Sequence, residues 1–262
     1  MVKINNVIIE QGHFPDGTLL TKFPYVSDDC VHIKWNYEND TELFTLICAR
    51  RHYAAQKAIL TMPYIPHARQ DRVKNTNDVF TLKYFCEVIN SLNFEAVLVL
   101  DPHSNVAPAL LNNVATIPVH QFITNAINAI KKSNNDTKPI LFFPDEGAMK
   151  RYSDMFALPY TFGIKKRNWE DGKILGLQIM NPELIVGKNV LIIDDICSRG
   201  GTFYHSAKAL HEAGAKSVSL YITHCENTIL EGEIFTSGLI DRVYTTNSLV
   251  HCDELKEKIT YV

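Results

Sequence analysis

The sequence lacks several features that would indicate particular classes of protein. Its six cysteines are scattered and none forms a C-x-x-C pair, so neither a zinc site nor a disulfide framework is indicated. The first residues contain no basic segment followed by an apolar run, and no apolar stretch approaches the length of a membrane span. The net charge of -3 implies no bulk attraction to nucleic acid or to an anionic membrane. We therefore expect a cytoplasmic protein that binds neither nucleic acid nor membrane.

Length and composition are those of an ordinary globular protein. The 262 residues are 46% hydrophobic and 21% charged, which allows two modest domains or one large one. A boundary near residue 120 divides the chain evenly. We expect two similar α/β units over residues 1–120 and 121–262, each with loops at the carboxyl edge of its sheet.

Short apolar runs alternate with segments whose apolar residues have helical spacing. This alternation predicts parallel sheets with helices on both faces. The predicted strands are Ala58–Met62, Ala96–Leu100, Pro139–Phe143, Val190–Ile193 and Ser217–Thr223. Two helices are marked by Leu82, Phe85, Cys86 and Ile89, and by Ile123, Ala126, Ile127 and Ile130.

The most informative stretch follows the predicted strand Val190–Ile193. Asp194 and Asp195 come first, then Gly200 and Gly201, and apolar residues at helical spacing follow. Ligands of open α/β sheets bind at the carboxyl ends of strands. The glycines let backbone N–H groups approach a phosphate at a helix N-terminus, while two carboxylates suit hydroxyl groups or a metal. A ribose 5-phosphate offers both a phosphate and vicinal hydroxyls; the alternative is an ordinary strand-to-helix turn.

Two polar loops follow predicted strands in the first half of the chain. Arg69 and Arg72 flank Gln70 and Asp71, and arginine forks bind phosphate oxygens and stack on flat bases. His103 follows the next strand, where a histidine can ligate a metal or donate to a phosphate. The alternatives are an exposed charged loop and a structural histidine.

Two further clusters lie in the second half. Asp145 follows the strand that ends at Phe143, where a turn is predicted to open a helix at Met149. This carboxylate could hold a metal, and the small residues after it would let phosphate oxygens approach the backbone. Residues Gly163–Gly172 are predicted to form a cationic turn. It is either a solvated hairpin tip or a mobile loop that neutralises charge during phosphoryl transfer.

Taken together, these clusters resemble the ribose-phosphate diphosphokinases, also called phosphoribosyl pyrophosphate synthetases. The run Pro63-Tyr64-x-x-x-Ala68-Arg69-Gln70-Asp71-Arg72 is close to a family signature, and Phe14-Pro15-Asp16-Gly17 is similar to the family's Phe-Ser/Pro-Asp-Gly-Glu. The other motifs follow in family order: Asp101-Pro102-His103, Asp145-Glu146-Gly147-Ala148, Lys165-Lys166-Arg167, and Asp194-Asp195 to Gly200-Gly201-Thr202. The resemblance covers about residues 14 to 250.

The resemblance implies a fold, a reaction and an assembly. The fold would be two type I phosphoribosyltransferase-like domains, with ATP on the first and ribose 5-phosphate on the second. The reaction would be the magnesium-dependent transfer of the diphosphoryl group of ATP to the 1-hydroxyl of ribose 5-phosphate. It would give phosphoribosyl diphosphate, used in nucleotide biosynthesis, and AMP. The protein would be a homodimer or larger homo-oligomer, because the family shares its ATP site across a dimer contact.

The resemblance also implies roles for individual residues. The catalytic cations would be Lys165 and Arg167. ATP would contact Phe14, Asp16, Arg69, Gln70, Asp71, Arg72 and His103. Ribose 5-phosphate would contact Asp194, Asp195, Ser198, Arg199, Gly200, Gly201 and Thr202, and the diphosphate loop would be Asp145, Glu146, Gly147 and Ala148. Magnesium would contact His103 and Asp145.

The chain departs from the family pattern in three respects. Ser198-Arg199 stands where the family usually has Asp-Thr, so a carboxylate near the ribose is lost and a cation is added. We expect Arg199 to pair with the 5-phosphate, with the neighbouring carboxylates as the alternative. Thr18 replaces the family's Glu, which leaves open how strictly ATP is preferred. The chain also looks short at both ends beside the family, which predicts weaker or absent allosteric control.

Two other functions stay open. A type I phosphoribosyltransferase would consume phosphoribosyl diphosphate at the Asp194–Thr202 loop, although the arginine cluster and the two-domain length argue against it. A catalytically inactive relative would bind nucleotide and regulate an active partner. It would be expected to lack the catalytic-loop lysine and the metal-site histidine, and both are present as Lys165 and His103.

Overall fold

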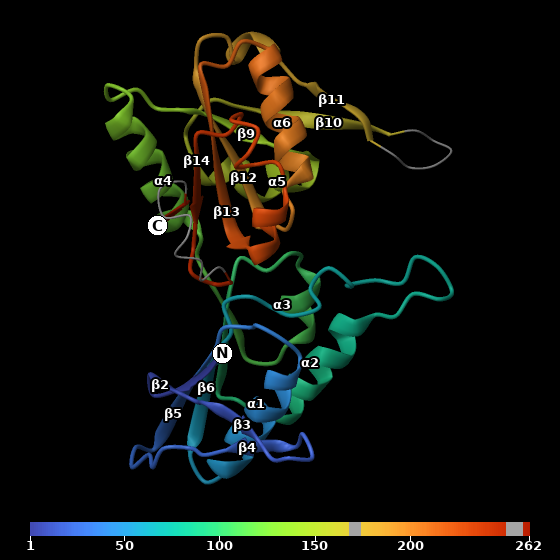
Figure 1. Ribbon diagram of the computed structural model, residues 1–262, viewed down its shortest axis with the longest axis vertical. Helices are drawn as coiled ribbons and strands as arrows, with labels where there is room; N and C mark the ends of the chain where they lie inside the picture. The colour runs from blue at the N-terminus through green and yellow to red at the C-terminus, as the bar shows by residue number, and fades with distance from the viewer. Residues whose placement is uncertain (168–173, 250–258) are drawn as a thin grey trace. The chain divides into compact units, whose positions relative to one another are not determined.

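The structure of the chain is a computed structural model that describes residues 1–167, 174–249 and 259–262. The chain forms two compact units, Met1–Pro118 and Val119–Val262, and each contains a mainly parallel sheet with helices (Figure 1). The predicted α/β class is therefore confirmed. Among the described residues, no helix is both long and apolar enough to cross a membrane.

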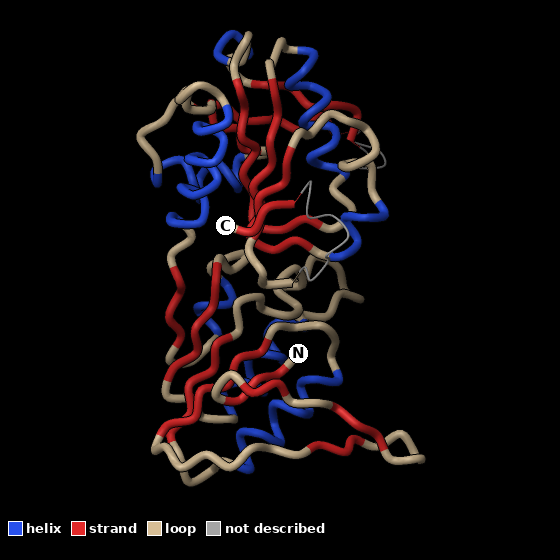
Figure 2. Tube along the Cα trace, turned by 60° about the vertical axis from the view of Figure 1, so that its left-hand side comes forward, coloured by secondary structure: helices blue, strands red, loops and turns tan. Residues whose placement is uncertain are grey.

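The sheet of the first unit has the strand order β2-β1-β5-β6-β7-β8. β1 is antiparallel to both β2 and β5, whereas β5 to β8 are parallel. Figure 2 shows the strands of the two units in red and the helices in blue. The strands are β1 (Val2–Ile4), β2 (Val7–Ile8), β5 (Cys30–Trp35), β6 (Lys57–Thr61), β7 (Ala96–Leu100) and β8 (Val114–Ile117). The helices between them are α1 (Thr41–His52), α2 (Thr81–Ser91) and α3 (Val106–Leu110).

The helices of the first unit pack on one face of its sheet. Because β5 to β8 are neighbours in chain order, right-handed crossovers carry α1, α2 and α3 to the same side. Val31, Ile33 and Leu60 are buried and alternate with more exposed neighbours along their strands. These residues share one apolar core with the buried residues of all three helices. The expectation of helices on both faces is therefore wrong for this unit.

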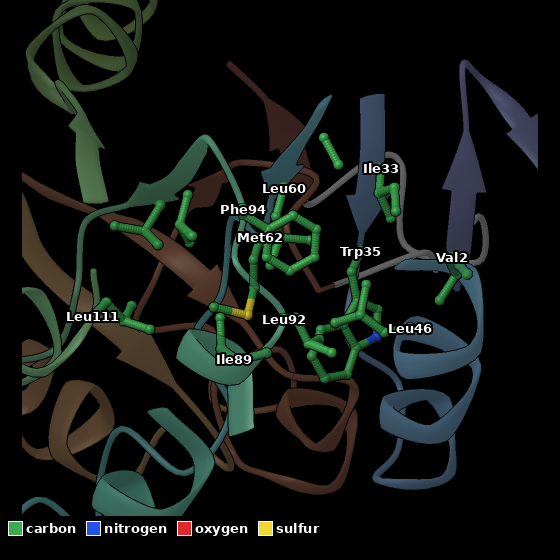
Figure 3. Packing of buried hydrophobic residues seen from close by; sticks show 14 of the residues in the cluster. Val2, Ile33, Trp35, Leu46, Leu60, Met62, Ile89, Leu92, Phe94 and Leu111 are labelled. Atoms are coloured by element: carbon green, nitrogen blue, oxygen red, sulfur yellow. The ribbon is translucent and has the colours of Figure 1, made fainter. Parts of the chain in front are cut away.

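Figure 3 shows part of this core. Trp35, Leu60 and Met62 lie against Leu46 of α1 and Ile89 of α2. Burial of each such side chain contributes about 1.5–3 kcal/mol. The four residues that mark the predicted helix in this unit are all buried on α2, so that prediction is confirmed.

A separate hairpin precedes β5. Its strands are β3 (Gln11–His13) and β4 (Leu19–Thr21). At the tip, the N–H of Gly17 donates to the carbonyl of Phe14 at 2.8 Å, and the N–H of Phe14 donates to the carbonyl of Thr18 at 2.9 Å. Gly17 has a φ of 84°, which favours glycine. The local sequence thus fixes a tight turn that leaves Phe14 exposed.

The sheet of the second unit has the strand order β11-β10-β9-β12-β13-β14-β15 in the part of the chain that the structure describes. β10 and β11 are antiparallel, and the other pairs are parallel. The strands are β9 (Ile140–Phe143), β10 (Tyr160–Arg167), β11 (Ile174–Ile179), β12 (Asn189–Cys197), β13 (Ser217–Cys225), β14 (Arg242–Thr245) and β15 (Ile259–Tyr261). The helices are α4 (His120–Ser133), α5 (Glu146–Tyr152) and α6 (Gly201–Glu212), with short 3-10 turns η1 (Ser153–Met155), η2 (Pro182–Leu184) and η3 (Asn227–Glu231).

Strand β12 is covered on both faces. Val190 and Ile192 belong to a core that includes the buried residues of α6. Leu191 and Ile193 belong to a second core with α4 and α5. The helices of this unit therefore flank the sheet on both sides, as predicted (Figure 1). A strand buried on both faces is expected to be an unbroken apolar run, which is how it stands in the sequence.

Two local boundaries differ from the prediction. α5 begins at Glu146 rather than at Met149, because the Oδ1 of Asp145 accepts the N–H of Ala148 at 3.1 Å and caps the helix. The cationic residues 165–167 lie on β10, paired with β11, rather than in a turn. The rest of the predicted turn, 168–172, lies outside the described residues.

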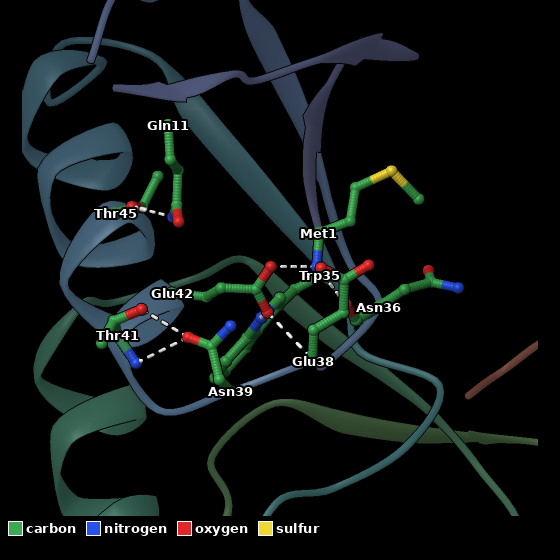
Figure 4. A network of polar contacts seen from close by, with 9 residues as sticks. All are labelled: Met1, Gln11, Trp35, Asn36, Glu38, Asn39, Thr41, Glu42 and Thr45. Atoms are coloured by element: carbon green, nitrogen blue, oxygen red, sulfur yellow. Dashed lines mark hydrogen bonds and ion pairs between the residues drawn. The ribbon is translucent and has the colours of Figure 1, made fainter. Parts of the chain in front are cut away.

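A buried carboxylate joins α1 to β5. Glu42 is 3% exposed, and its Oε2 accepts the indole N–H of Trp35 at 2.9 Å and the backbone N–H of Glu38 at 2.9 Å (Figure 4). The amino group of Met1 contacts the same carboxylate. Apolar spacing does not reveal α1, because Glu42 and Thr45 are polar residues on its buried face.

We expect Glu42→Ala to lower the free energy of unfolding of this unit by about 1–3 kcal/mol, because it leaves a buried indole N–H without its acceptor. Urea unfolding in a Trp169→Phe background measures this, since Trp35 is then the only tryptophan. Glu38→Ala is the matched control, because the Glu38 side chain is 48% exposed. Equal losses in the two variants would show that the buried bond contributes nothing.

Candidate functional site

A glycine turn follows the carboxyl end of β12, and its residues line a pocket. β12 ends at Cys197 and α6 begins at Gly201. Gly200, between them, has a φ of 77°, and a Cβ there would lie 2.1 Å from the side chain of Ile234. The pocket has a volume of about 290 Å³. All the predicted ribose 5-phosphate residues except Asp195 line it: Asp194, Ser198, Arg199, Gly200, Gly201 and Thr202.

Carboxylates gather beneath this turn. Asp194 is half-buried, and its Oδ1 accepts the backbone N–H of Asp195 at 2.9 Å. Burial, the charge of Asp195 and a smaller contribution from Asp145 raise the pKa of Asp194. Asp195 is itself buried, and its Oδ2 lies 3.3 Å from Nη1 of Arg151. The ends of β9 and β12 therefore carry three carboxylates that influence one another by charge, with the Arg151 guanidinium beside Asp195.

Ser198 and Arg199 contact the segment that follows β13. The Oγ of Ser198 lies 3.0 Å from Oγ1 of Thr228. The Nη2 and Nε of Arg199 lie 3.0 and 3.2 Å from Oε2 of Glu231. Among the described residues Arg199 is thus paired with Glu231, a residue that the sequence did not single out.

The first unit has its own pocket, of about 380 Å³. It lies where the loops after β6 and β7 meet, at the carboxyl edge of the sheet. Five predicted ATP residues line it: Arg69, Gln70, Asp71, Arg72 and His103. The structure adds Lys74, Asp78 and Val79 to the lining. A pocket lined by several cationic side chains, two carboxylates and an apolar side chain suits a ligand with a phosphate and a flat ring.

Asp71 positions other residues of this pocket. Its carboxylate is buried and accepts Nε of Arg72 at 2.7 Å and Nη2 of Arg72 at 3.1 Å. It also accepts the hydroxyl of Ser104, from the loop after β7, at 2.7 Å. The Arg72 guanidinium and the Ser104 hydroxyl hold the pKa of Asp71 below its usual range. Asp71 therefore ties the two pocket loops together and orients the Arg72 guanidinium.

Other predicted residues lie elsewhere or outside the description. Phe14 and Asp16 are at the tip of the β3–β4 hairpin and do not line the described pocket of their unit. Asp16 accepts the N–H and the hydroxyl of Thr18 at 3.0 and 2.7 Å, which lowers its pKa. Glu146, Gly147 and Ala148 form the first turn of α5. Lys165 and Arg167 lie on β10, and their side chains are outside the described part of the structure.

Sequence reasoning did not find Arg151, Ser104 or Glu231. Arg151 lies in the last turn of α5, six residues after the capping Asp145. That offset is not a whole number of helical turns, so it gave no sequence signal. Ser104 directly follows His103 and was within a loop already singled out. Glu231 gave no local signal, because its partner Arg199 is 32 residues away in the chain.

Comparisons with known proteins agree on one family. Residues 120–233 match the model of the phosphoribosyl transferase domain. The ribose-phosphate pyrophosphokinase of Saccharolobus solfataricus is 28% identical over 235 residues, covering 86% of this chain and 77% of the relative. That of Pyrococcus abyssi is 28% identical over 247 residues, covering 91% of this chain and 81% of the relative. The crystal structure of phosphoribosylpyrophosphate synthetase from Mycobacterium smegmatis has a TM-score of 0.77 at 17% identity, covering 97% of this chain and 85% of that one.

The structural likeness identifies the fold as that of the phosphoribosyltransferase type. The sequence likeness covers 86% and 91% of the chain and therefore extends into both units. The chain is thus similar to ribose-phosphate pyrophosphokinases, which are transferases, over most of its length.

Two glycines near the β12 turn should respond to alanine with opposite signs. A Cβ on Gly232 would lie 1.8 Å from the carbonyl oxygen of Arg199, so Gly232→Ala should lower the free energy of unfolding by about 3 kcal/mol. A Cβ on Gly201 would meet nothing within 4 Å, so Gly201→Ala should raise it by up to about 1 kcal/mol, the helix propensity difference. Thermal unfolding of both variants tests this, and two equal shifts would contradict the described packing.

Proposed function

We propose that the protein transfers the diphosphoryl group of ATP to the 1-hydroxyl of ribose 5-phosphate, giving phosphoribosyl diphosphate for nucleotide biosynthesis and AMP. The observation that carries this proposal is the end of β12, where two carboxylates adjoin a glycine turn at the start of α6. The similarity to ribose-phosphate pyrophosphokinases supports the same reaction.

The second unit would bind the sugar phosphate. The first backbone N–H groups of a helix have no partner within the helix, and the helix dipole favours an anion there. Gly200, Gly201 and Thr202 would therefore hold the 5-phosphate. Asp194 and Asp195 would accept hydrogen bonds from the ribose hydroxyls, because they end the strand just before the phosphate turn. Arg151 would restrain Asp195, to which it is already paired.

The first unit would bind the nucleotide. Arg69 and Arg72 would pair with phosphate oxygens, and the guanidinium of Arg72 is already oriented by Asp71. Gln70 and His103 line the same pocket and would contact ATP there. Phe14 and Asp16, on the hairpin tip, would complete the adenine site of a neighbouring subunit. This role requires the homodimer or larger homo-oligomer implied by the resemblance.

Magnesium is the proposed cofactor. Mg²⁺ prefers oxygen ligands and is usually held by one or two carboxylates together with substrate phosphates. Among the described residues there is no group of three or more His, Cys, Asp or Glu side chains that could hold a metal by themselves. A carboxylate such as Asp145 fits a metal that arrives with the nucleotide. Asp145 and His103 would contact the metal, which when bound would neutralise phosphate charge.

The chemistry needs positioning and charge more than covalent help. The 1-hydroxyl attacks the β-phosphorus of ATP, the bond to the α-phosphate oxygen breaks, and the hydroxyl proton leaves to solvent. Negative charge develops on the phosphate oxygens and on the departing AMP. Lys165 and Arg167 would stabilise that charge, and the two pockets would hold the reactants in place.

The proposed reaction is tested by its products. Purified protein with ATP, magnesium and ribose 5-phosphate should give AMP and phosphoribosyl diphosphate in equal amounts, measured by chromatography. Omitting ribose 5-phosphate or chelating magnesium should abolish AMP formation. ADP as the product would indicate an ordinary kinase. Consumption of added phosphoribosyl diphosphate with a nucleobase would instead indicate a phosphoribosyltransferase.

Lys165→Ala should lower kcat by about 100- to 1000-fold and leave the KM for ribose 5-phosphate nearly unchanged, because its charge would act on the transition state. Lys166→Ala removes the same charge at the next position and is the matched control, with kcat close to that of the wild type. Steady-state kinetics separates the two parameters. If both variants keep wild-type turnover, the role given to Lys165 is wrong.

A further inference from the structure

Both residues that depart from the family pattern in the phosphate turn contact the segment 226–232. Ser198 contacts Thr228, and Arg199 contacts Glu231. The backbone of the turn is held by the same segment, since a Cβ on Gly232 would lie 1.8 Å from the carbonyl oxygen of Arg199. Close packing therefore fixes the backbone at Arg199. The part of this residue that can change position is its side chain.

The pair between Arg199 and Glu231 lies at the surface. Both Nη2 and Nε of Arg199 contact one oxygen, Oε2 of Glu231, at 3.0 and 3.2 Å. The two side chains are 73% and 56% exposed. Solvent and salt screen such a pair, and exposed ion pairs contribute little free energy. The guanidinium can therefore leave Glu231 at small cost.

Arg199 also lines the pocket at the end of β12. A phosphate in that pocket is a better partner for a guanidinium than an exposed carboxylate. It carries up to two charges and accepts two parallel N–H bonds, and the helix N-terminus beside it favours an anion. Glu231 and a bound phosphate are thus two anions within reach of one cation.

We propose that Glu231 sets the affinity of this pocket for its sugar phosphate by competing with the phosphate for Arg199. The inference rests on the proposed function, which supplies the ligand. Without ligand, Arg199 is paired with Glu231. When the 5-phosphate binds, the guanidinium moves to it, and when the product leaves, Glu231 takes the guanidinium back. Glu231 is a positioning residue, because it touches Arg199 and not the substrate.

Isothermal titration calorimetry with ribose 5-phosphate tests this exchange. Glu231→Gln removes the competing charge, so the Kd should fall by about threefold, the scale of one exposed ion pair. In an Arg199→Gln background, adding Glu231→Gln should leave the Kd unchanged, because the cation they compete for is absent. Glu233 is an exposed residue two positions after Glu231. Glu233→Gln removes the same charge there and should also leave the Kd unchanged. Inorganic phosphate, as a second probe, should give the same order of variants.

Three results would overturn the proposal. One is a Kd in Glu231→Gln that equals that of Glu233→Gln. Another is weaker binding in Glu231→Gln, which would mean that Glu231 orients Arg199 toward the phosphate rather than competing with the phosphate for it. The third is an undiminished effect of Glu231→Gln in the Arg199→Gln background. Absence of ribose 5-phosphate binding by the wild type is a different result, because it would contradict the proposed function itself.

Discussion

The second unit depends on one strand, β12, being held in the middle of its sheet. β9 and β13 pair with it in parallel register on either side, and its apolar side chains alternate between two cores. A slip of one residue would move each side chain to the opposite face, so the cores fix the register. That register decides where the strand ends. The packing of the apolar side chains of β12 thus fixes the positions of Asp194, Asp195 and the glycine turn.

Much of the fold could be predicted from local patterns. The five predicted strands and the two predicted helices are present, because each depends on apolar residues at a spacing that one segment contains. Apolar spacing did not predict α1, since this helix buries polar groups such as Glu42. It also did not predict that the helices of the first unit lie on one face of the sheet. That layer follows from the order of β5 to β8 in the sheet, which no single segment encodes.

For the candidate site, too, local features could be predicted and contacts between distant residues could not. Loops at the carboxyl ends of strands were identified from the sequence. The Arg69–Arg72 loop and His103 line one pocket, and residues of the β12 turn line another. The hydrogen-bond and ion-pair partners of individual side chains were not identified from the sequence. Asp71 bonds to Ser104, 33 residues away, and Arg199 bonds to Glu231, 32 residues away. Such pairs depend on which loops the sheet brings together, and this is decided only by the tertiary fold.

The two strand orders imply different schedules of assembly during synthesis. In the first unit each of the strands β6 to β8 joins the strand made just before it, so its pocket can close as soon as the loop after β7 has emerged. β12 instead pairs with β9, from which it is separated by α5, β10 and β11, and with β13, which follows it. Contacts between distant segments form later than local ones. The phosphate turn, which also needs Gly232 and Ile234 against it, is therefore completed later than the pocket of the first unit.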